Sequence, residues 1–184
     1  MKLLDKNELK SNLGKENFWM PKRLVGKLSY ISGIEPFDKL LGGKLFTEVI
    51  AVINLSYRTL GLQIEMMKNF KTYNTGITEG KIISIHLEDK EQLYEMKDKS
   101  VIGRAVIGGL ILGPVGAIIG GMTGIGKKEV KSNMPEMILS ISYESDDKEK
   151  NIILFSCKHK DRESVEMFFK ENYSSKFQTT KQAN

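Results

Sequence analysis

The chain has 184 residues, a length that suits one domain with its own hydrophobic core. Hydrophobic residues make up 40% and charged residues 28%, which excludes a disordered chain and indicates an ordinary globular protein. The formal net charge of +5 is a weak signal for nucleic acid and is compatible with anionic lipid.

The cysteine usage and the first residues indicate a compartment. Cys157 is the only cysteine, so the chain cannot form an internal disulfide, which favours a reducing environment. Charged residues follow soon after Leu4, a pattern unlike that of a signal peptide. We therefore expect a cytoplasmic protein.

The N-terminal half predicts a short extension followed by strands. We assign residues 1–24 to the extension, because Pro21 would end a short helix there. Residues 35–44 predict a loop or short helix after a turn at Gly33. In the other segments, apolar residues alternate with polar ones or form short runs. These segments predict strands at residues 27–34, 47–55, 60–66, 70–78 and 83–88.

The C-terminal half predicts a hairpin and a closing helix. Strands at residues 137–143 and 151–157 flank a polar turn at residues 145–150. Asp161 is the expected N-cap of a final helix. Apolar residues recur in it at helical spacing: Val165, Phe168, Phe169 and Tyr173. The tail, residues 174–184, is polar and is expected to be frayed.

This order of elements predicts a mainly β fold of the α+β class. Several short antiparallel strands followed by one amphipathic helix fit a small barrel or sandwich that the helix plugs. We expect the domain to span residues 25–173 and to be interrupted by an insert at residues 101–126.

The insert is the most unusual part of the sequence. The stretch from Gly103 to Gly126 (GRAVIGGLILGPVGAIIGGMTGIG) holds nine of the 17 glycines and one charged residue, Arg104. Small residues recur in it at four-residue spacing, the pattern that lets helix backbones approach closely. These packing positions are Ala105, Gly109 and Gly113 in the first run, and Gly116, Gly120 and Gly124 in the second. Pro114 lacks a backbone donor and favours a turn between two helical arms.

The insert is expected to return to the side from which it starts. The segments before and after it both read as strands of one domain, and a single membrane span would place them on opposite sides of the bilayer. Each arm of about a dozen residues is about 18 Å long, shorter than the roughly 30 Å hydrocarbon core. A re-entrant or interfacial hairpin therefore fits the sequence better than two full spans.

The apolar side chains of the insert need a cover. About a dozen large ones lie in or beside it, and leaving all of them in water would forfeit on the order of 20 kcal/mol. Basic residues near both ends favour anionic headgroups at the cytoplasmic face. These candidate headgroup contacts are Lys97, Lys99, Arg104, Lys127, Lys128 and Lys131.

A second interpretation keeps the hairpin away from lipid. It would then be buried in a homo-oligomer or folded back on the domain's own apolar surface, with the lysines as a solvated rim. The spacing of small residues does not distinguish these environments, because it reports close packing alone. Trp19 is open to two interpretations as well, as an interfacial anchor or as a packing residue.

Together, these features resemble a bacterial family of pleckstrin-homology-like (GRAM-like) domains that a glycine-zipper hairpin interrupts. The resemblance rests on the insert with the basic pair Lys127 and Lys128, and on the strand patterns KLSYISG at 27–33 and KIISIHLE at 81–88. It implies a non-enzymatic module that binds lipid, a peptide or itself. It supplies no active-site residues.

Signals for catalysis and cofactors are weak. The segment 121–128 matches the spacing of a phosphate-binding loop, but Lys128 stands where Ser or Thr would hold magnesium, and alternating strand-helix units are lacking. Cys157 fits a small buried residue better than a nucleophile, and the two separate histidines, His86 and His159, do not make a metal site. We therefore expect no catalytic residues, metal, cofactor, nucleotide or nucleic acid.

The leading hypothesis is a non-enzymatic, membrane-associated protein at the inner face of the cell membrane. Its scaffold would present the hairpin for shallow insertion and self-association. Oligomerised hairpins that perturb the bilayer are a subsidiary hypothesis. The alternative is a soluble binding or regulatory module that oligomerises through a buried hairpin.

Overall fold

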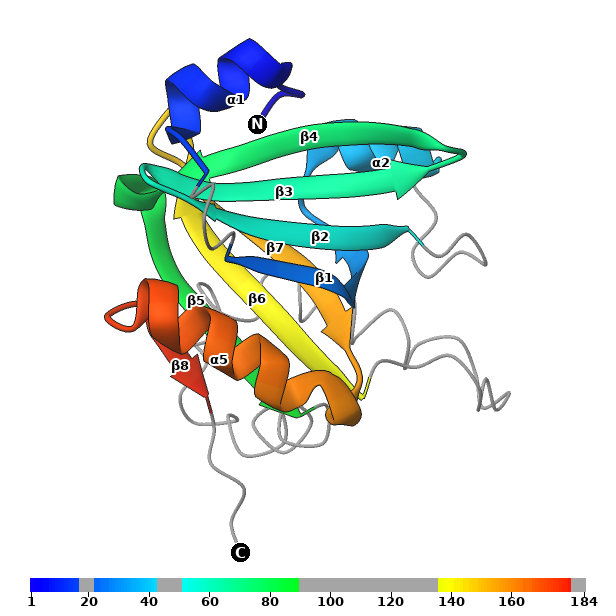
Figure 1. Cartoon of the computed structure of the whole chain (residues 1–184), viewed down its shortest axis with the longest axis vertical. Coiled ribbons are helices and arrows are strands. Elements are labelled where there is room, and N and C mark those ends of the chain that lie inside the picture. The colour runs from blue at the N-terminus through cyan, green and yellow to red at the C-terminus, as the bar shows by residue number, and fades with distance from the viewer. Residues whose placement is uncertain (17–21, 43–50, 90–135, 180–184) are drawn as a thin grey trace, which may run out of the picture.

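The computed structural model of the chain describes residues 1–16, 22–42, 51–89 and 136–179 (Figure 1). Its strands are β1 (Arg23–Ser32), β2 (Val52–Arg58), β3 (Gly61–Lys68), β4 (Lys71–Thr78), β5 (Ile82–Asp89), β6 (Met137–Glu144), β7 (Lys150–Cys157) and β8 (Phe177–Thr179). The α-helices are α1 (Lys6–Leu13), α2 (Glu35–Leu41) and α5 (Arg162–Tyr173), and two short 3-10 helices are η1 (Glu79–Lys81) and η2 (His159–Asp161).

The strands form one open, mixed sheet in the order β4-β3-β2-β1-β7-β6-β5-β8. Neighbouring strands are antiparallel except β5 and β8, which are parallel. In Figure 1, β2, β3 and β4 cross over β5, β6 and β7, so that the two halves of the sheet enclose a common interior. The fold is thus mainly β with helices, as the sequence predicts. The hydrogen-bonded ladder of the described residues does not close into a barrel, because β4 and β8 are its two edges.

One hydrophobic core lies between the two halves of the sheet. Strand alternation turns Leu139 and Ile141 of β6 inward, where both are fully buried, and turns Ser140 outward. The predicted apolar face of α5 enters the same core and consists of Val165, Phe168, Phe169 and Tyr173. Burying such a side chain contributes about 1.5–3 kcal/mol. α5 therefore plugs the core, as the sequence predicts.

The C-terminal tail is more structured than the sequence predicts. Residues 177–179 form β8, which pairs with β5, where a frayed tail is expected from residue 174. The Phe177 ring stacks on Phe169 with 5.6 Å between centroids, and Lys176 Nζ donates hydrogen bonds to two backbone carbonyls, those of Glu79 and Ile82. These contacts with residues far away in the sequence stabilise a strand too short to show periodicity.

The N-terminal extension packs against the edge of the sheet. Asp5 caps α1 by accepting hydrogen bonds from two backbone N–H groups of its first turn. Leu9 and Leu13 of α1 are buried beside β4. Just before the helix, the Leu4 N–H donates to the Asn74 carbonyl at 2.8 Å. The extension thus covers part of an edge strand that would otherwise expose unpaired backbone groups.

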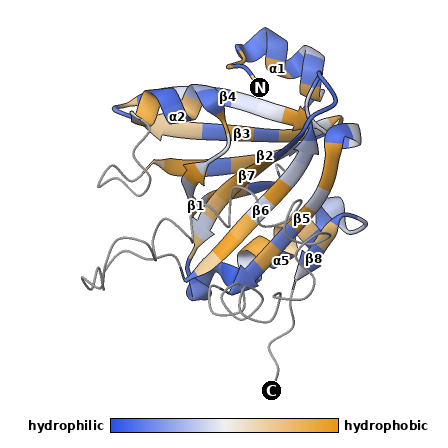
Figure 2. Ribbon diagram, turned by 180° about the vertical axis from the view of Figure 1, so that it is seen from behind, coloured by the Kyte–Doolittle hydropathy of each residue, from blue (hydrophilic) through white to orange (hydrophobic). Residues whose placement is uncertain are grey.

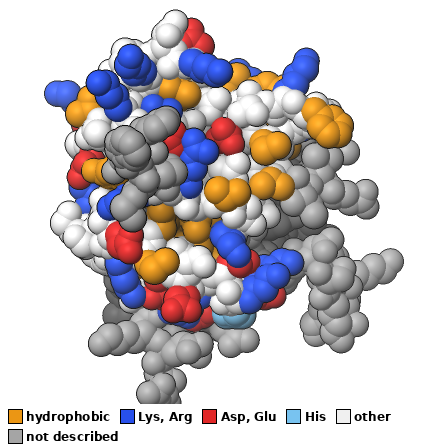
Figure 3. All heavy atoms as spheres, in the orientation of Figure 1, with side chains coloured by type: hydrophobic (Ala, Val, Ile, Leu, Met, Phe, Trp, Pro, Cys, Tyr) orange, Lys and Arg blue, Asp and Glu red, His pale blue; other side chains and the backbone are white. Residues whose placement is uncertain are grey.

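The turn between β3 and β4 is strained and exposed. Asn69 and Phe70 have φ values of 50° and 60°, and the Phe70 side chain is fully exposed. Figure 3 shows this side of the molecule, on which separate apolar side chains stand among lysines and arginines. Two-residue hairpin turns with positive φ favour Asn-Gly, because a residue with a Cβ is strained in this conformation by about 1–2 kcal/mol.

We expect the substitution Phe70→Gly to raise the free energy of unfolding by about 1 kcal/mol, because it relieves this strain without removing a buried contact. Urea denaturation measures the change. Leu60→Gly is the control, since Leu60 lies in the neighbouring β2–β3 turn and does not have a positive φ. The control should be less stable than wild type, and a Phe70→Gly variant that is also less stable would contradict the argument.

Candidate functional site

The two strands between which the insert occurs in the sequence lie side by side. β5 and β6 pair in an antiparallel register that ends with Asp89 opposite Met137. Cα atoms of directly opposite residues in such a pair are about 4.5–5.5 Å apart. The prediction that the strands flanking the insert belong to one sheet is therefore confirmed. We call the polar side chains around this point the insert base and define it by Asp89, Glu136, His159, Arg162 and Glu166.

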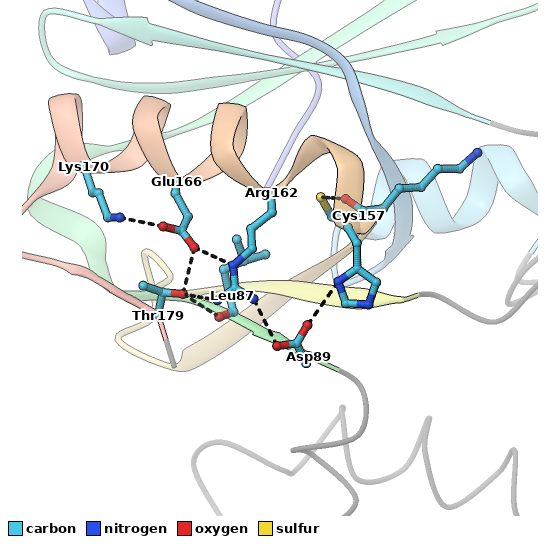
Figure 4. Close-up of polar contacts among 9 residues, drawn as sticks. Leu87, Asp89, Cys157, Arg162, Glu166, Lys170 and Thr179 are labelled. Carbon is cyan, nitrogen blue, oxygen red and sulfur yellow. Dashed lines mark hydrogen bonds and ion pairs between the residues drawn. The ribbon is translucent and has the colours of Figure 1, made fainter. Parts of the chain in front are cut away.

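Asp89 ties the end of β5 to the start of α5. Its Oδ2 accepts a hydrogen bond of 3.1 Å from Arg162 Nη1, and His159 Nδ1 lies 3.3 Å from Oδ1 (Figure 4). The side chains of Asp89 and Arg162 are only 13% and 18% exposed. Because little water reaches the pair, the attraction is screened less than in a surface ion pair.

Arg162 extends this network along the helix, as Figure 4 shows. Its Nε donates to Glu166 Oε1 at 2.7 Å, and Lys170 Nζ donates to Glu166 Oε2 at 2.6 Å. Arg162 Nη2 also donates to Thr179 Oγ1 at 3.2 Å, which links β8 to the network. Burial alone would raise the pKa of Glu166, but the bonds from Lys170 and Arg162 outweigh it and hold that pKa below its ordinary value.

The start of β6, where the chain returns to the sheet, is bonded to the same segment. Glu136, the residue before β6, accepts a hydrogen bond of 2.6 Å from the backbone N–H of His159 through its Oε2. η2 and the first turn of α5 therefore contact the chain both where it leaves the described sheet and where it returns to it. A displacement of this segment would act on the place where the insert leaves the domain.

Asp161 differs from its predicted role. It occupies the N-cap position of α5, as expected, but its side chain makes no capping hydrogen bond. Its Oδ1 instead accepts a hydrogen bond of 2.8 Å from Lys27 Nζ of β1. The opposite charge on the neighbouring strand attracts the carboxylate more strongly than neutral backbone N–H groups do.

The residues that the sequence predicts for the site lie outside the described residues. Residues 90–135 contain all the predicted packing positions of the hairpin and all the predicted headgroup contacts, and Trp19 lies in residues 17–21. These assignments stay predictions. What the structure adds is the insert base, where the chain leaves the sheet after Asp89 and re-enters it at Met137.

The sequence contains only part of the signal for the insert base. Arg162, Glu166 and Lys170 follow one another at four-residue spacing, which favours ion pairs along a helix. Asp89 is 73 residues away from Arg162, and no periodicity connects them. The link exists because the tertiary fold brings the end of β5 beside α5.

The residue types that enzymes use are not assembled in the described residues. Cys157 is 3% exposed and its Sγ donates to the Lys158 carbonyl at 3.3 Å. Within the described ranges, no group of His, Cys, Asp and Glu side chains could hold a metal ion. Among the helices of these ranges, none is long and apolar enough to cross a membrane.

We expect Arg162→Ala to lower the free energy of unfolding by about 2–3 kcal/mol, because it leaves the shielded carboxylates of Asp89 and Glu166 without their shared partner. Urea denaturation measures this loss. Lys170→Ala is the matched control, since it removes an exposed partner of the same Glu166 and should cost at most about 0.5 kcal/mol. Equal losses in the two variants would contradict a special contribution from the insert base.

We expect the Cys157 thiol to resist alkylation in the native protein. Burial, with smaller effects from Asp161 and Glu136, raises the pKa of Cys157 to about 12, so the reactive thiolate is scarce near pH 8. Because the chain has a single cysteine, iodoacetamide incorporation measured by mass spectrometry reports on this residue alone. Denatured protein is the control and should react fully. Equally rapid reaction of the native protein would contradict the buried assignment.

One comparison with known proteins identifies the family. The family described as glycine zipper containing PH domain matches residues 46–166, more than half of the chain. This range includes the insert, β2 to β7 and the start of α5. A search of curated proteins found no match. PH-like domains are generally non-catalytic. The chain belongs to the family of glycine zipper containing PH domains.

Proposed function

We propose that this protein is a non-enzymatic, membrane-associated scaffold. Its PH-like domain holds a glycine-zipper hairpin for shallow insertion into the inner face of the cell membrane and for self-association. Membrane lipid and further copies of the chain are its partners. Perturbation of the bilayer by assembled hairpins is an extension of this proposal.

The adjacency of Asp89 and Met137 is the observation that carries the proposal. A chain that leaves and re-enters the sheet at neighbouring residues must reverse its direction in between. Combined with the apolar composition of residues 101–126, this supports a hairpin that enters lipid from one side and returns. Arms of about 18 Å are too short for the roughly 30 Å hydrocarbon core, which favours shallow insertion.

The charges near the insert support a role for anionic lipid. Basic residues near both ends of a re-entrant segment can contact phosphate groups while the apolar part lies deeper. Each such residue near an anionic surface contributes about 1 kcal/mol. Six of them are available: Lys97, Lys99, Arg104, Lys127, Lys128 and Lys131.

A soluble module with a buried hairpin is the second candidate. The observation that favours it is a group of apolar side chains on the outer face of β6 and β7, which point away from the core. In this alternative, protein surface covers the insert and the hairpin serves oligomerisation.

The proposal is tested by replacing Gly109, Gly116 and Gly120 together with Leu, which keeps the segment apolar but blocks close helix packing. We expect wild type to sediment with vesicles that contain anionic lipid and to form oligomers there. The triple variant should lose oligomers, measured by chemical cross-linking, and still sediment with the vesicles.

Gly80→Leu is the control, because Gly80 lies outside the insert, lacks a positive φ and has open space around it. It should behave as wild type in both measurements. Lys127→Glu with Lys128→Glu should weaken sedimentation with anionic vesicles. The proposal would be contradicted if wild type stayed monomeric and did not bind anionic vesicles. Oligomers without vesicle binding would favour the soluble alternative.

A further inference from the structure

The outer face of strands β5, β6 and β7 carries apolar side chains among small polar ones. Alternation places Met137, Leu139 and the other core residues of β6 on the inner face, so that Ile138 and Ser140 point outward. On β7 the outward residues include Leu154. Figure 2 views the molecule from this side, where β5, β6 and β7 lie next to one another. We call this surface the outer face and define it by His86, Glu88, Ile138, Ser140 and Leu154.

The strand register arranges these residues in rows. Glu88 lies opposite Ile138 in the row nearest the insert. In the next row His86 lies opposite Ser140, and Ser140 lies opposite Leu154. The side chains between the larger ones are small, because the same face also carries the following serines: Ser84, Ser142 and Ser156. A flat surface with apolar positions and small neighbours is suited to close contact with a helix backbone.

The apolar residues of this face are buried although they do not belong to the core. Ile138 is 4% and Leu154 is 1% exposed, and neither is part of the core cluster. An outward side chain of a sheet in water keeps such low exposure only where another part of the chain lies on it. The outer face therefore behaves as a contact surface.

The pKa shifts of His86 and Glu88, two ionisable side chains on the outer face, indicate that little water reaches them. Burial lowers the pKa of His86 and raises the pKa of Glu88, and among the described residues no ion pair contributes to either shift. The residues that face His86 are Ser140 on β6 and Gln178 on β8, while Ser84 and Glu88 flank it on its own strand. Since Glu88 is the only charged one among them, desolvation governs the state of His86.

The insert is the segment best placed to cover this face. The chain that carries it leaves the sheet after Asp89 and re-enters it at Met137, one residue beyond the row of Glu88 and Ile138. An eight-residue strand such as β6 is about 27 Å long, and an arm of the hairpin is about 18 Å long. An arm is therefore long enough to lie across both rows, and the chain on either side of residues 101–126 connects it to the insert base. Its glycines expose backbone and would fit against the serines of the sheet.

We propose that the outer face is the docking surface for residues 101–126 of the same chain in the absence of membrane. The docked hairpin covers Ile138 and Leu154 and is released when lipid takes their place. This inference rests on the proposed function only in the release step, because docking itself requires no membrane. According to this proposal, the outer face covers the apolar side chains of the hairpin in water, and lipid covers them at the bilayer.

A photo-cross-linking amino acid placed at Ser140 in the full chain tests the docking. Mass spectrometry identifies the residues that it captures. We expect peptides from residues 101–126 of the same chain. Capture of residues 43–50, or of a second chain in a dimer band, would overturn the proposal, and so would the absence of captured insert peptides. The same probe at Thr72, an exposed residue of β4, is the control and should not capture the insert.

The pKa of His86, measured by NMR titration of the full chain, provides a second readout. Leu154→Lys places a charge on the outer face and should release the hairpin. The new positive charge by itself lowers the pKa of His86, whereas rehydration raises it, so a rise indicates release. An unchanged or lower pKa would overturn the proposal. Ile83→Lys, at an exposed position of β5, is the control and should leave the pKa unraised.

Vesicles separate this inference from the proposed function. With anionic vesicles, capture of the insert by the probe at Ser140 should decrease as the protein binds. Capture that persists on protein bound to vesicles would overturn the release step. Protein that docks the hairpin but never binds vesicles would leave the docking surface intact and refute the membrane function instead.

Discussion

The pairing of β5 with β6 is the constraint on which the rest of the molecule depends. Because Asp89 and Met137 are directly opposite, everything between them must start and end at one point of the sheet. A long apolar segment in that position cannot act as a simple anchor that crosses the bilayer once. The sheet thus requires the chain between these two residues to return to the place from which it starts.

The C-terminal elements reinforce this constraint from the other side. α5 buries its apolar face in the core, and its first turn and η2 bond to Asp89 and Glu136, the described residues on either side of the segment that contains the insert. β8 then adds a strand beside β5, and Thr179 joins the network of Arg162. The same helix therefore closes the domain and fixes the exit of the insert, so that a loss of packing in α5 would loosen both.

Residue patterns predict some levels of this structure better than others. Alternation along residues 137–143 and 151–157 gives the strands β6 and β7 and their inward faces, because one side of each strand must meet a core. The helical spacing of Val165 and Phe169 predicts α5 for the same reason. The insert base cannot be predicted from such patterns, since the bond between Asp89 and Arg162 depends on the tertiary fold alone. β8 cannot be predicted from residue patterns either, because its stability comes from the stacking of Phe177 on Phe169.

In the scheme proposed above, the hairpin has two alternative covers, and the difference in free energy between them decides which one it takes. In the proposed scheme, lipid and the outer face both remove apolar side chains of the insert from water, so part of this gain is common to the two states. In this proposal docking has the advantage of tethering, because Asp89 and Met137, between which the insert occurs in the sequence, both lie next to the outer face. Anionic lipid has the advantage of six basic residues, at about 1 kcal/mol each near a charged surface. A neutral bilayer lacks this term, and each 1.4 kcal/mol changes the ratio of the two states about tenfold. In this scheme the charge of the membrane, more than its apolar interior, determines where the hairpin resides.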